Sequence, residues 1–238
     1  MDDRLRETRV DSEQVFDGAL LKVYRDHARL PDGGVAIREF IRHPGAVAIV
    51  AIFDDGSVLL ERQFRYPCNQ VFIEIPAGKI DPGESAMECA ARELREETGY
   101  VAERWRRLGC LHPCIGYSDE TIEIWLAEEL RFLGASLDSE EFIEAFRMKP
   151  ADALAAASNG GITDAKSVIG LYWAAHAGVL GPRQAEGLSS HISGGDFLAI
   201  SRPFVIDRKP RSFRKSSCGV RPGKTSHVPL GWTLHGRA

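Results

Sequence analysis

The sequence has no apolar run long enough to cross a bilayer as a helix. Such a helix needs about 20 consecutive apolar residues, whereas the stretch GAVAIVAIF at residues 45–53 has nine. The first residues, MDDRLR, contain no apolar signal core. The lack of both features predicts a chain that neither spans a membrane nor is secreted.

Cysteine is scarce as well, with five residues in 238. The number is odd, the spacing is irregular, and Cys110 and Cys114 lie four positions apart, which does not match a CxxC redox or zinc motif. We therefore expect reduced thiols in a cytoplasmic protein.

Positive charge is in deficit over most of the chain. The net charge is −4, and residues 1–180 contain 20 basic and 31 acidic side chains, which argues against a nucleic-acid-binding surface. Residues 181–238 reverse this balance, with 10 basic and 3 acidic side chains, and they show no hydrophobic periodicity. We expect a disordered basic tail there. The competing interpretation is a small nucleic-acid or membrane patch.

The rest of the composition is that of a globular protein, with 44% hydrophobic residues. Residues 20–30 and 34–41 are rich in β-formers and flank the turn signal PDGG. Residues 45–53 are typical of a strand buried on both faces. After the turn DDG, residues 58–64 are expected to form the second strand of a hairpin.

Three segments have helical patterns. Ser85 and Glu88 form a capping box for a helix that stops at Gly99, and residues 151–157 and 166–179 are predicted to form two more helices. Together with an alternating strand at residues 121–126, they predict an α/β domain that ends near residue 180.

The first of these helices carries several carboxylates on one side. Glu93, Glu96 and Glu97 are spaced by three and four positions, so they project together and repel one another. A hard divalent cation would offset this repulsion, and oxygen ligands without His or Cys favour Mg²⁺ or Mn²⁺. Arg92 is placed to pair with Glu96. This pattern favours metal-dependent attack on a phosphate ester or anhydride; the alternative is a solvated, salt-bridged helix face.

The segment from Gly78 to Tyr100 fits the pattern GX5EX7REUXEEXGU, the Nudix box, at every defined position. The chain thus resembles the Nudix hydrolases, which cleave a nucleoside diphosphate linked to another group. The resemblance implies a Nudix α/β/α sandwich at residues 45–180, preceded by a small N-terminal antiparallel β subdomain at residues 1–44. It also implies that Ala77, through its carbonyl, binds Mg²⁺ or Mn²⁺ together with Glu93 and Glu97, and that Glu96 assists catalysis.

Motifs outside the box resemble the branch of ADP-ribose and nucleoside diphosphate sugar pyrophosphatases. They are REF and HPGAV at residues 38–47, RQFRY at 62–66, EIPAGKID at 74–81, a proline at 113 and GITDAK at 161–166. The resemblance implies hydrolysis of ADP-ribose to AMP and ribose 5-phosphate. GDP-mannose or another nucleotide sugar is the alternative, because Cys114 and Ile115 depart from the shorter Ser-Pro-Gly turn of the branch.

The same resemblance assigns further roles. Arg38 and Arg65 are expected to bind the substrate diphosphate, for which the guanidinium fork is suited, and Glu74 to contact substrate or metal. The N-terminal strands are expected to exchange across a homodimer, so that both subunits build each site.

The general base is expected outside the box, because a metal-bound carboxylate has a lowered pKa and accepts protons poorly. The segment GASLDSEEF at residues 134–142 resembles the acidic loop that supplies the base in this branch. Glu141 is favoured over Glu140, and Glu120 is the next candidate.

Two other functional classes remain open. A catalytically inactive Nudix domain could serve as a sensor, but such domains lose box glutamates, and this chain retains them all. An RNA-decapping enzyme would have a basic face on the catalytic domain, whereas residues 1–180 are acidic.

Overall fold

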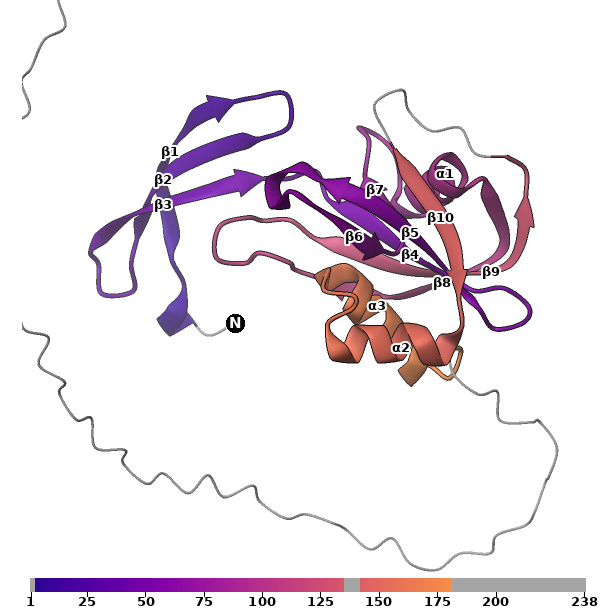
Figure 1. Cartoon of the computed structure of the whole chain (residues 1–238). Coiled ribbons are helices and arrows are strands. Elements are labelled where there is room, and N and C mark those ends of the chain that lie inside the picture. Colours follow the sequence, from indigo (N-terminus) through magenta and orange to yellow (C-terminus); the bar gives the residue numbers. More distant parts are fainter. Residues whose placement is uncertain (1–2, 135–141, 181–238) are drawn as a thin grey trace, which may run out of the picture. The chain divides into compact units, whose positions relative to one another are not determined.

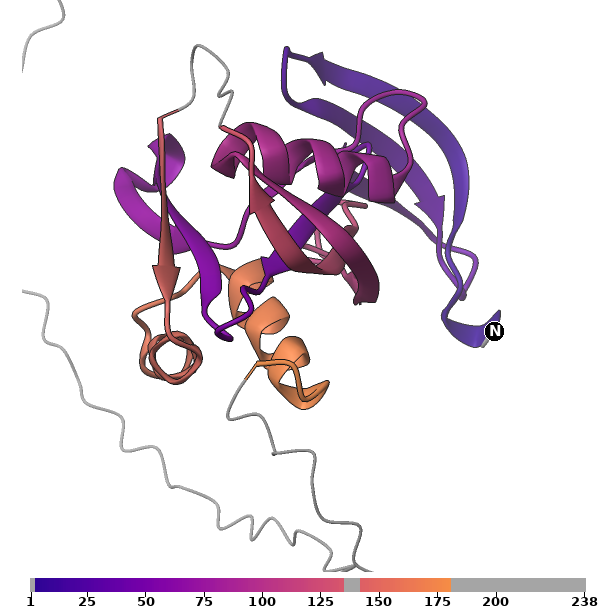
Figure 2. The ribbon, with the colours of Figure 1, turned by 90° about the vertical axis from the view of Figure 1, so that its right-hand side faces the viewer.

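The computed structural model describes residues 3–134 and 142–180, which form three β-sheets and three α-helices (Figures 1 and 2). The strands are β1 (Thr8–Asp17), β2 (Lys22–Arg29), β3 (Val35–Arg42), β4 (Ala46–Ala51), β5 (Val58–Arg65), β6 (Gln70–Glu74), β7 (Ala77–Lys79), β8 (Tyr100–Leu111), β9 (Ile122–Phe132) and β10 (Ile143–Met148). The helices are α1 (Ala86–Thr98), α2 (Pro150–Asn159) and α3 (Ala165–His176), with short 3₁₀ turns at Asp3–Leu5 and Tyr66–Cys68. The predicted tail at residues 181–238 lies outside the described residues. No helix in the described ranges is long and apolar enough to span a membrane.

The N-terminal antiparallel subdomain is confirmed. Strands β1, β2 and β3 form a separate three-stranded sheet in that order. The predicted turn joins β2 to β3, and the Leu30 amide donates to the Gly34 carbonyl at 2.8 Å. All ten residues of β1 are exposed to solvent.

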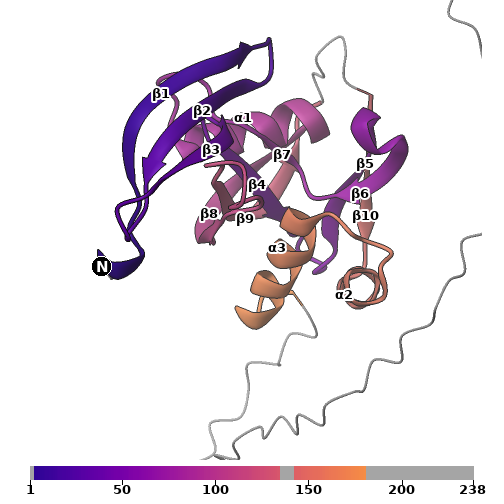
Figure 3. The same cartoon turned by 90° about the vertical axis from the view of Figure 1, so that its left-hand side faces the viewer.

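The central sheet has the order β7-β4-β9-β8, and β4 is one of its two inner strands. Its six residues are all buried, as predicted. Val47 and Ile49 pack in one core cluster with Leu94 of α1, while Val50 packs in the other with Leu171 of α3. The sheet therefore lies between α1 and α3 (Figure 3), which confirms the α/β/α arrangement.

The predicted hairpin of β4 and β5 is wrong. The two strands share only an isolated bridge between Ile52 and Val58, and β5 belongs to a third sheet of order β10-β5-β6. The physical reason is that β7 and β9 already occupy both hydrogen-bonding edges of β4. After the turn, β5 therefore pairs with β6 and β10 instead.

Helix α1 begins and ends as predicted. The Ser85 hydroxyl accepts from the Glu88 amide at 3.3 Å, and the Glu88 carboxylate accepts from the Ser85 amide at 2.9 Å. Gly99 adopts φ = 76°, a left-handed conformation that suits glycine, and its amide donates to Arg95. Because both ends of the helix are fixed, the positions of the box carboxylates along the helix are fixed as well.

Candidate active site

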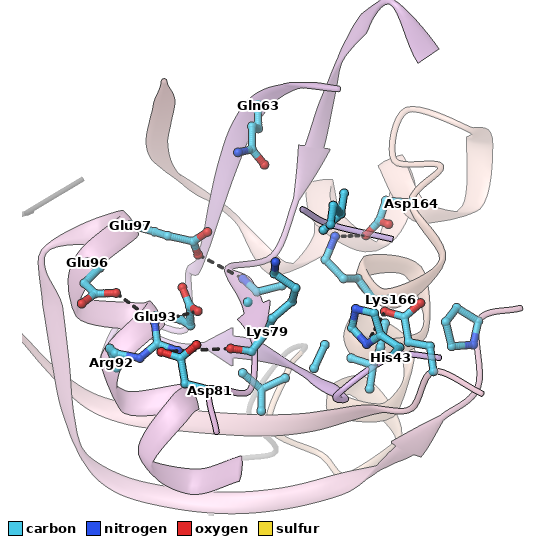
Figure 4. A pocket seen from close by; sticks show the side chains of 18 of the residues that line it. His43, Gln63, Lys79, Asp81, Arg92, Glu93, Glu96, Glu97, Asp164 and Lys166 are labelled. Carbon is cyan, nitrogen blue, oxygen red and sulfur yellow. Dashed lines mark hydrogen bonds and ion pairs between the residues drawn. The ribbon is translucent and has the colours of Figure 1, made fainter. Parts of the chain in front are cut away.

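A cavity of about 640 Å³ opens beside α1 and β7 (Figure 4). Its charged lining residues come from β5, β7 and the loop that follows it, α1, the segment before β9, and the start of α3. The acidic ones are Asp81, Glu93, Glu96, Glu97, Glu120 and Asp164, and the basic ones are Arg65, Lys79, Arg92 and Lys166. A site that gathers both signs of charge suits a negatively charged ligand together with a cation.

The predicted metal ligands meet at one wall of this cavity. Glu97 Oε2 accepts a hydrogen bond from the Ala77 amide at 3.0 Å, which ties α1 to β7. A Cβ on Gly78 would lie 1.8 Å from Glu93 Oε1. Only a glycine at that position therefore lets the Glu93 carboxylate approach the β7 backbone.

Arg92 organises the neighbouring carboxylates. Its guanidinium donates to both oxygens of Glu84, at 2.9 and 3.0 Å, to Glu93 at 2.8 Å and to Glu96 at 3.0 Å. The predicted pairing of Arg92 with Glu96 is therefore confirmed. The hydrogen bonds from Arg92 lower the pKa of Glu84 to about 2. Glu84 is thus an anchor for Arg92.

The donor set at this wall fits a hard divalent cation. In the described part of the chain no three His, Cys, Asp or Glu side chains already converge as a metal cluster, and Arg92 engages oxygens of Glu93 and Glu96. The groups at hand are nevertheless all oxygen donors, namely the carboxylates of Glu93 and Glu97 and the Ala77 carbonyl. Oxygen ligands of this kind suit Mg²⁺.

Arg65 lines the cavity and is held by Glu74. Its Nε and Nη2 atoms donate to the two Glu74 oxygens, each at 2.7 Å. Lys166 also bonds to Glu74, and its Nζ donates to Asp164 at 3.0 Å. Burial raises the pKa of Glu74, but the hydrogen bonds and charges of Arg65 and Lys166 outweigh it, so the pKa is lowered.

Two predicted substrate contacts lie elsewhere in this chain. Glu74 is only 2% exposed and is not among the residues that line the main cavity. Arg38 lies on β3, away from the cavity lining, where its guanidinium donates to both oxygens of Glu7 at 2.7 and 2.9 Å. Of the two arginines predicted to bind the substrate diphosphate, only Arg65 lines the cavity.

The structure describes one of the three candidate general bases. Glu140 and Glu141 lie outside the described residues. Glu120 lines the cavity, and its Oε1 atom lies 3.9 Å from His43 Nδ1.

Sequence analysis gave no individual role to six polar lining residues, namely His43, Gln63, Lys79, Asp81, Asp164 and Lys166. Each lies inside a motif that was noted for its resemblance to the branch: HPGAV, RQFRY, EIPAGKID or GITDAK. The signal was therefore present, but a motif alone does not say which of its side chains face a cavity.

Comparison with known proteins agrees with this geometry. Residues 42–168 match the NUDIX domain model, and residues 7–41 match the nucleoside diphosphate sugar hydrolase N-terminal domain model. An ADP-ribose pyrophosphatase of Bacillus subtilis (strain 168) is 37% identical over 71% of this chain and 92% of its own length. An ADP-ribose pyrophosphatase of Mycobacterium tuberculosis is 42% identical over 52% of this chain and 61% of its own length.

A solved structure shares the fold. The crystal structure of an ADP compounds hydrolase superposes with a TM-score of 0.65, covers 73% of this chain and 95% of its own, and is 24% identical in sequence. The domain matches, the curated relatives and the complete box from Gly78 to Tyr100 lead to one conclusion: the chain belongs to the Nudix family of hydrolases.

Proposed function

We propose that this protein hydrolyses the diphosphate bond of ADP-ribose with Mg²⁺, giving AMP and ribose 5-phosphate. The observation that carries the proposal is the meeting of Glu93, Glu97 and Ala77 at one wall of a cavity that Arg65 and Lys166 also line. Relatives named ADP-ribose pyrophosphatase support the choice of substrate.

Glu93, Glu97 and the Ala77 carbonyl would hold the metal, with Mn²⁺ as a substitute for Mg²⁺. When bound, the ion supplies charge stabilisation at the phosphate oxygens and a more acidic water. Glu96 would assist from the next position on the helix face. Arg92 orients these carboxylates through its hydrogen bonds to Glu93 and Glu96.

Arg65 and Lys166 would bind the diphosphate from the other side of the cavity. Both are cations, and both are oriented by the buried carboxylate of Glu74. In this proposal Glu74 is a positioning residue, because its oxygens are occupied by these two cations.

The proton acceptor for the attacking water would be Glu141, or its neighbour Glu140. The reason is chemical: carboxylates that hold a dication have lowered pKa values and are poor bases. Glu120 is the next candidate for the general base, since it lines the cavity.

We further propose that the N-terminal sheet completes the site in a homodimer. In one chain Arg38 lies outside the cavity lining, and the sheet exposes large apolar side chains on β1 and β3, among them Phe16 at 54% and Ile37 at 57%. Exposed apolar surface of this kind is typical of an interaction site. Light scattering should give twice the chain mass of 26.3 kDa, and a monomer would contradict this part of the proposal.

The substrate is tested by a panel of ADP-ribose, GDP-mannose, ADP-glucose and NADH, with a phosphatase added to release phosphate from the products. We expect the highest kcat/KM for ADP-ribose. A higher value for GDP-mannose would select the alternative substrate. No hydrolysis of any of the four would overturn the proposed function and favour a sensor role.

A further inference from the structure

His43 lines the cavity but has no role in the site described so far. It lies between β3 and β4, with a side chain that is 16% exposed. Its backbone amide donates to Asp119 Oδ1 at 2.8 Å, which ties it to the segment before β9. Figure 4 shows the ring at the end of the cavity that holds Lys166, away from Glu93 and Glu97.

The contacts of its ring determine which nitrogen carries hydrogen. Nδ1 accepts a hydrogen bond from the Gly45 amide at 3.1 Å. The Glu120 carboxylate lies 3.9 Å from the same nitrogen, which is too long for a hydrogen bond. A ring nitrogen that accepts from a backbone amide has no proton of its own, so the neutral imidazole carries its hydrogen on Nε2.

The turn that supplies this amide is rigid. Gly45 adopts φ = 99°, a conformation that side chains rarely tolerate, and it is buried. Its carbonyl accepts from the amide of Ile80, a residue inside the Nudix box, at 3.1 Å. The imidazole is therefore held in one orientation from the backbone side.

The other ring nitrogen, Nε2, is a donor without a partner in the described part of the chain. No hydrogen bond is formed by Nε2 of His43 within those residues, and the residue borders the cavity. A fixed N–H that borders a cavity is suited to an acceptor oxygen of a ligand.

We propose that His43 is a substrate-binding residue whose Nε2–H donates a hydrogen bond to a phosphate oxygen of the nucleoside diphosphate. This inference rests on the proposed function. Arg65 and Lys166 already bring positive charge to the cavity. A neutral donor adds a hydrogen bond to phosphate without adding another cation that would repel a bound divalent metal ion.

Two substitutions separate this role from a structural one. In His43→Asn, the amide oxygen replaces Nδ1 and accepts from Gly45, but the donor at the Nε2 position is lost. In His43→Gln, the longer side chain places an N–H donor near the Nε2 position. A substrate contact thus requires Gln to replace histidine better than Asn does, whereas a role in the turn requires the reverse.

The experiment measures the Kd of ADP-ribose and of ADP by calorimetry in EDTA, and kcat/KM for ADP-ribose with Mg²⁺. We expect His43→Asn to raise both Kd values and to lower kcat/KM by about tenfold or more, the effect of losing a hydrogen bond to a charged group. His43→Gln should stay within about threefold of wild type. His43→Asn should unfold at the wild-type temperature, whereas His43→Gln leaves the buried Gly45 amide without its acceptor and should unfold at a lower temperature.

Three results would overturn the inference: wild-type binding by His43→Asn, an equal loss in both variants, or a loss for ADP-ribose without a loss for ADP. The last result would place the contact on the terminal sugar, which ADP lacks. Failure of the proposed function looks different, because wild type itself would then neither bind nor hydrolyse ADP-ribose, and the inference would fall with it.

Discussion

Glu74 holds Arg65 with both of its carboxylate oxygens, each at 2.7 Å from a guanidinium nitrogen. The Glu74 side chain is 2% exposed and the Arg65 side chain 42% exposed, so a buried anion fixes the direction of a cation that reaches the cavity. Lys166 binds the same carboxylate from α3. One buried side chain thus aligns cations from two separate elements.

Replacing Glu74 should therefore harm both stability and substrate binding. Glu74→Gln keeps the size but presents an amide N–H to one donor, so we expect a loss of about 2 kcal/mol in the free energy of unfolding. The KM for ADP-ribose should rise about tenfold. Urea denaturation and steady-state kinetics measure the two effects.

Glu144→Gln, which removes an exposed partner of Arg62, is the matched control and should unfold within about 0.5 kcal/mol of wild type. Equal unfolding of the two variants would contradict the role of Glu74.

Gly78 lies at the cavity wall that carries the predicted metal ligands, and a side chain at this position should impair turnover. A Cβ there would lie 1.8 Å from Glu93 Oε1, and a flexible glutamate can move away, so Gly78→Ala should fold. The displaced carboxylate would no longer serve the metal, and turnover should fall by about 100-fold or more. Gly116→Ala, where a Cβ meets nothing within 4 Å, should keep wild-type turnover. Normal turnover in Gly78→Ala would show that Glu93 need not approach β7.

The hydrogen bonds from Arg92 to Glu84 predict a specific dependence of stability on pH. The pKa of Glu84 is lowered to about 2 by Arg92, and a carboxylate with a lower pKa in the folded state stabilises the fold above its unfolded-state pKa. That contribution is lost as pH falls through the folded-state pKa. The stability difference between wild type and Arg92→Gln should therefore be constant from neutral pH to about pH 5 and shrink toward about pH 2.

Urea unfolding at a series of pH values measures this difference. Arg95→Gln, an exposed arginine on the same helix, is the control and should show no such trend. A difference between wild type and Arg92→Gln that persists undiminished near pH 2 would show that Glu84 is not the partner that matters.

The general base is tested by comparing Glu140→Gln and Glu141→Gln across a pH series. We expect Glu141→Gln to lose most of its turnover at neutral pH while binding ADP-ribose normally. Turnover should recover in part at high pH, where hydroxide replaces the assisted water. If both variants keep wild-type turnover, Glu120→Gln becomes the variant to test.

Local signals explain what could be predicted from the sequence. Helix α1 was predictable because the capping box at Ser85 and the stop at Gly99 act within a few residues of the helix ends. The burial of β4 followed from its apolar composition. The box placed Glu93 and Glu97 on one helix face before any tertiary contact was known.

Long-range pairing explains what could not be predicted. The partners of β4 and β5 depend on which other strands pair with each of their edges. Most of those strands lie far away in the sequence, so no local pattern around β4 or β5 indicates the pairing. Glu74 and Arg38 are visible as charges in the sequence, but the bond of Glu74 to Lys166 of α3 and the pairing of Arg38 with Glu7 arise only in the fold. The orientation of His43 likewise depends on the turn at Gly45.

The most direct test of the account is to identify the products formed from ADP-ribose by wild type and by Glu97→Gln, with Mg²⁺ and with EDTA. Chromatography should show AMP and ribose 5-phosphate in equal amounts for wild type with Mg²⁺, and no product with EDTA. Glu97→Gln keeps the size and loses one charge, so its turnover should fall by about 100-fold or more while the fold is retained. Wild-type turnover in Glu97→Gln at saturating Mg²⁺, or products formed equally well in EDTA, would contradict the metal-dependent mechanism.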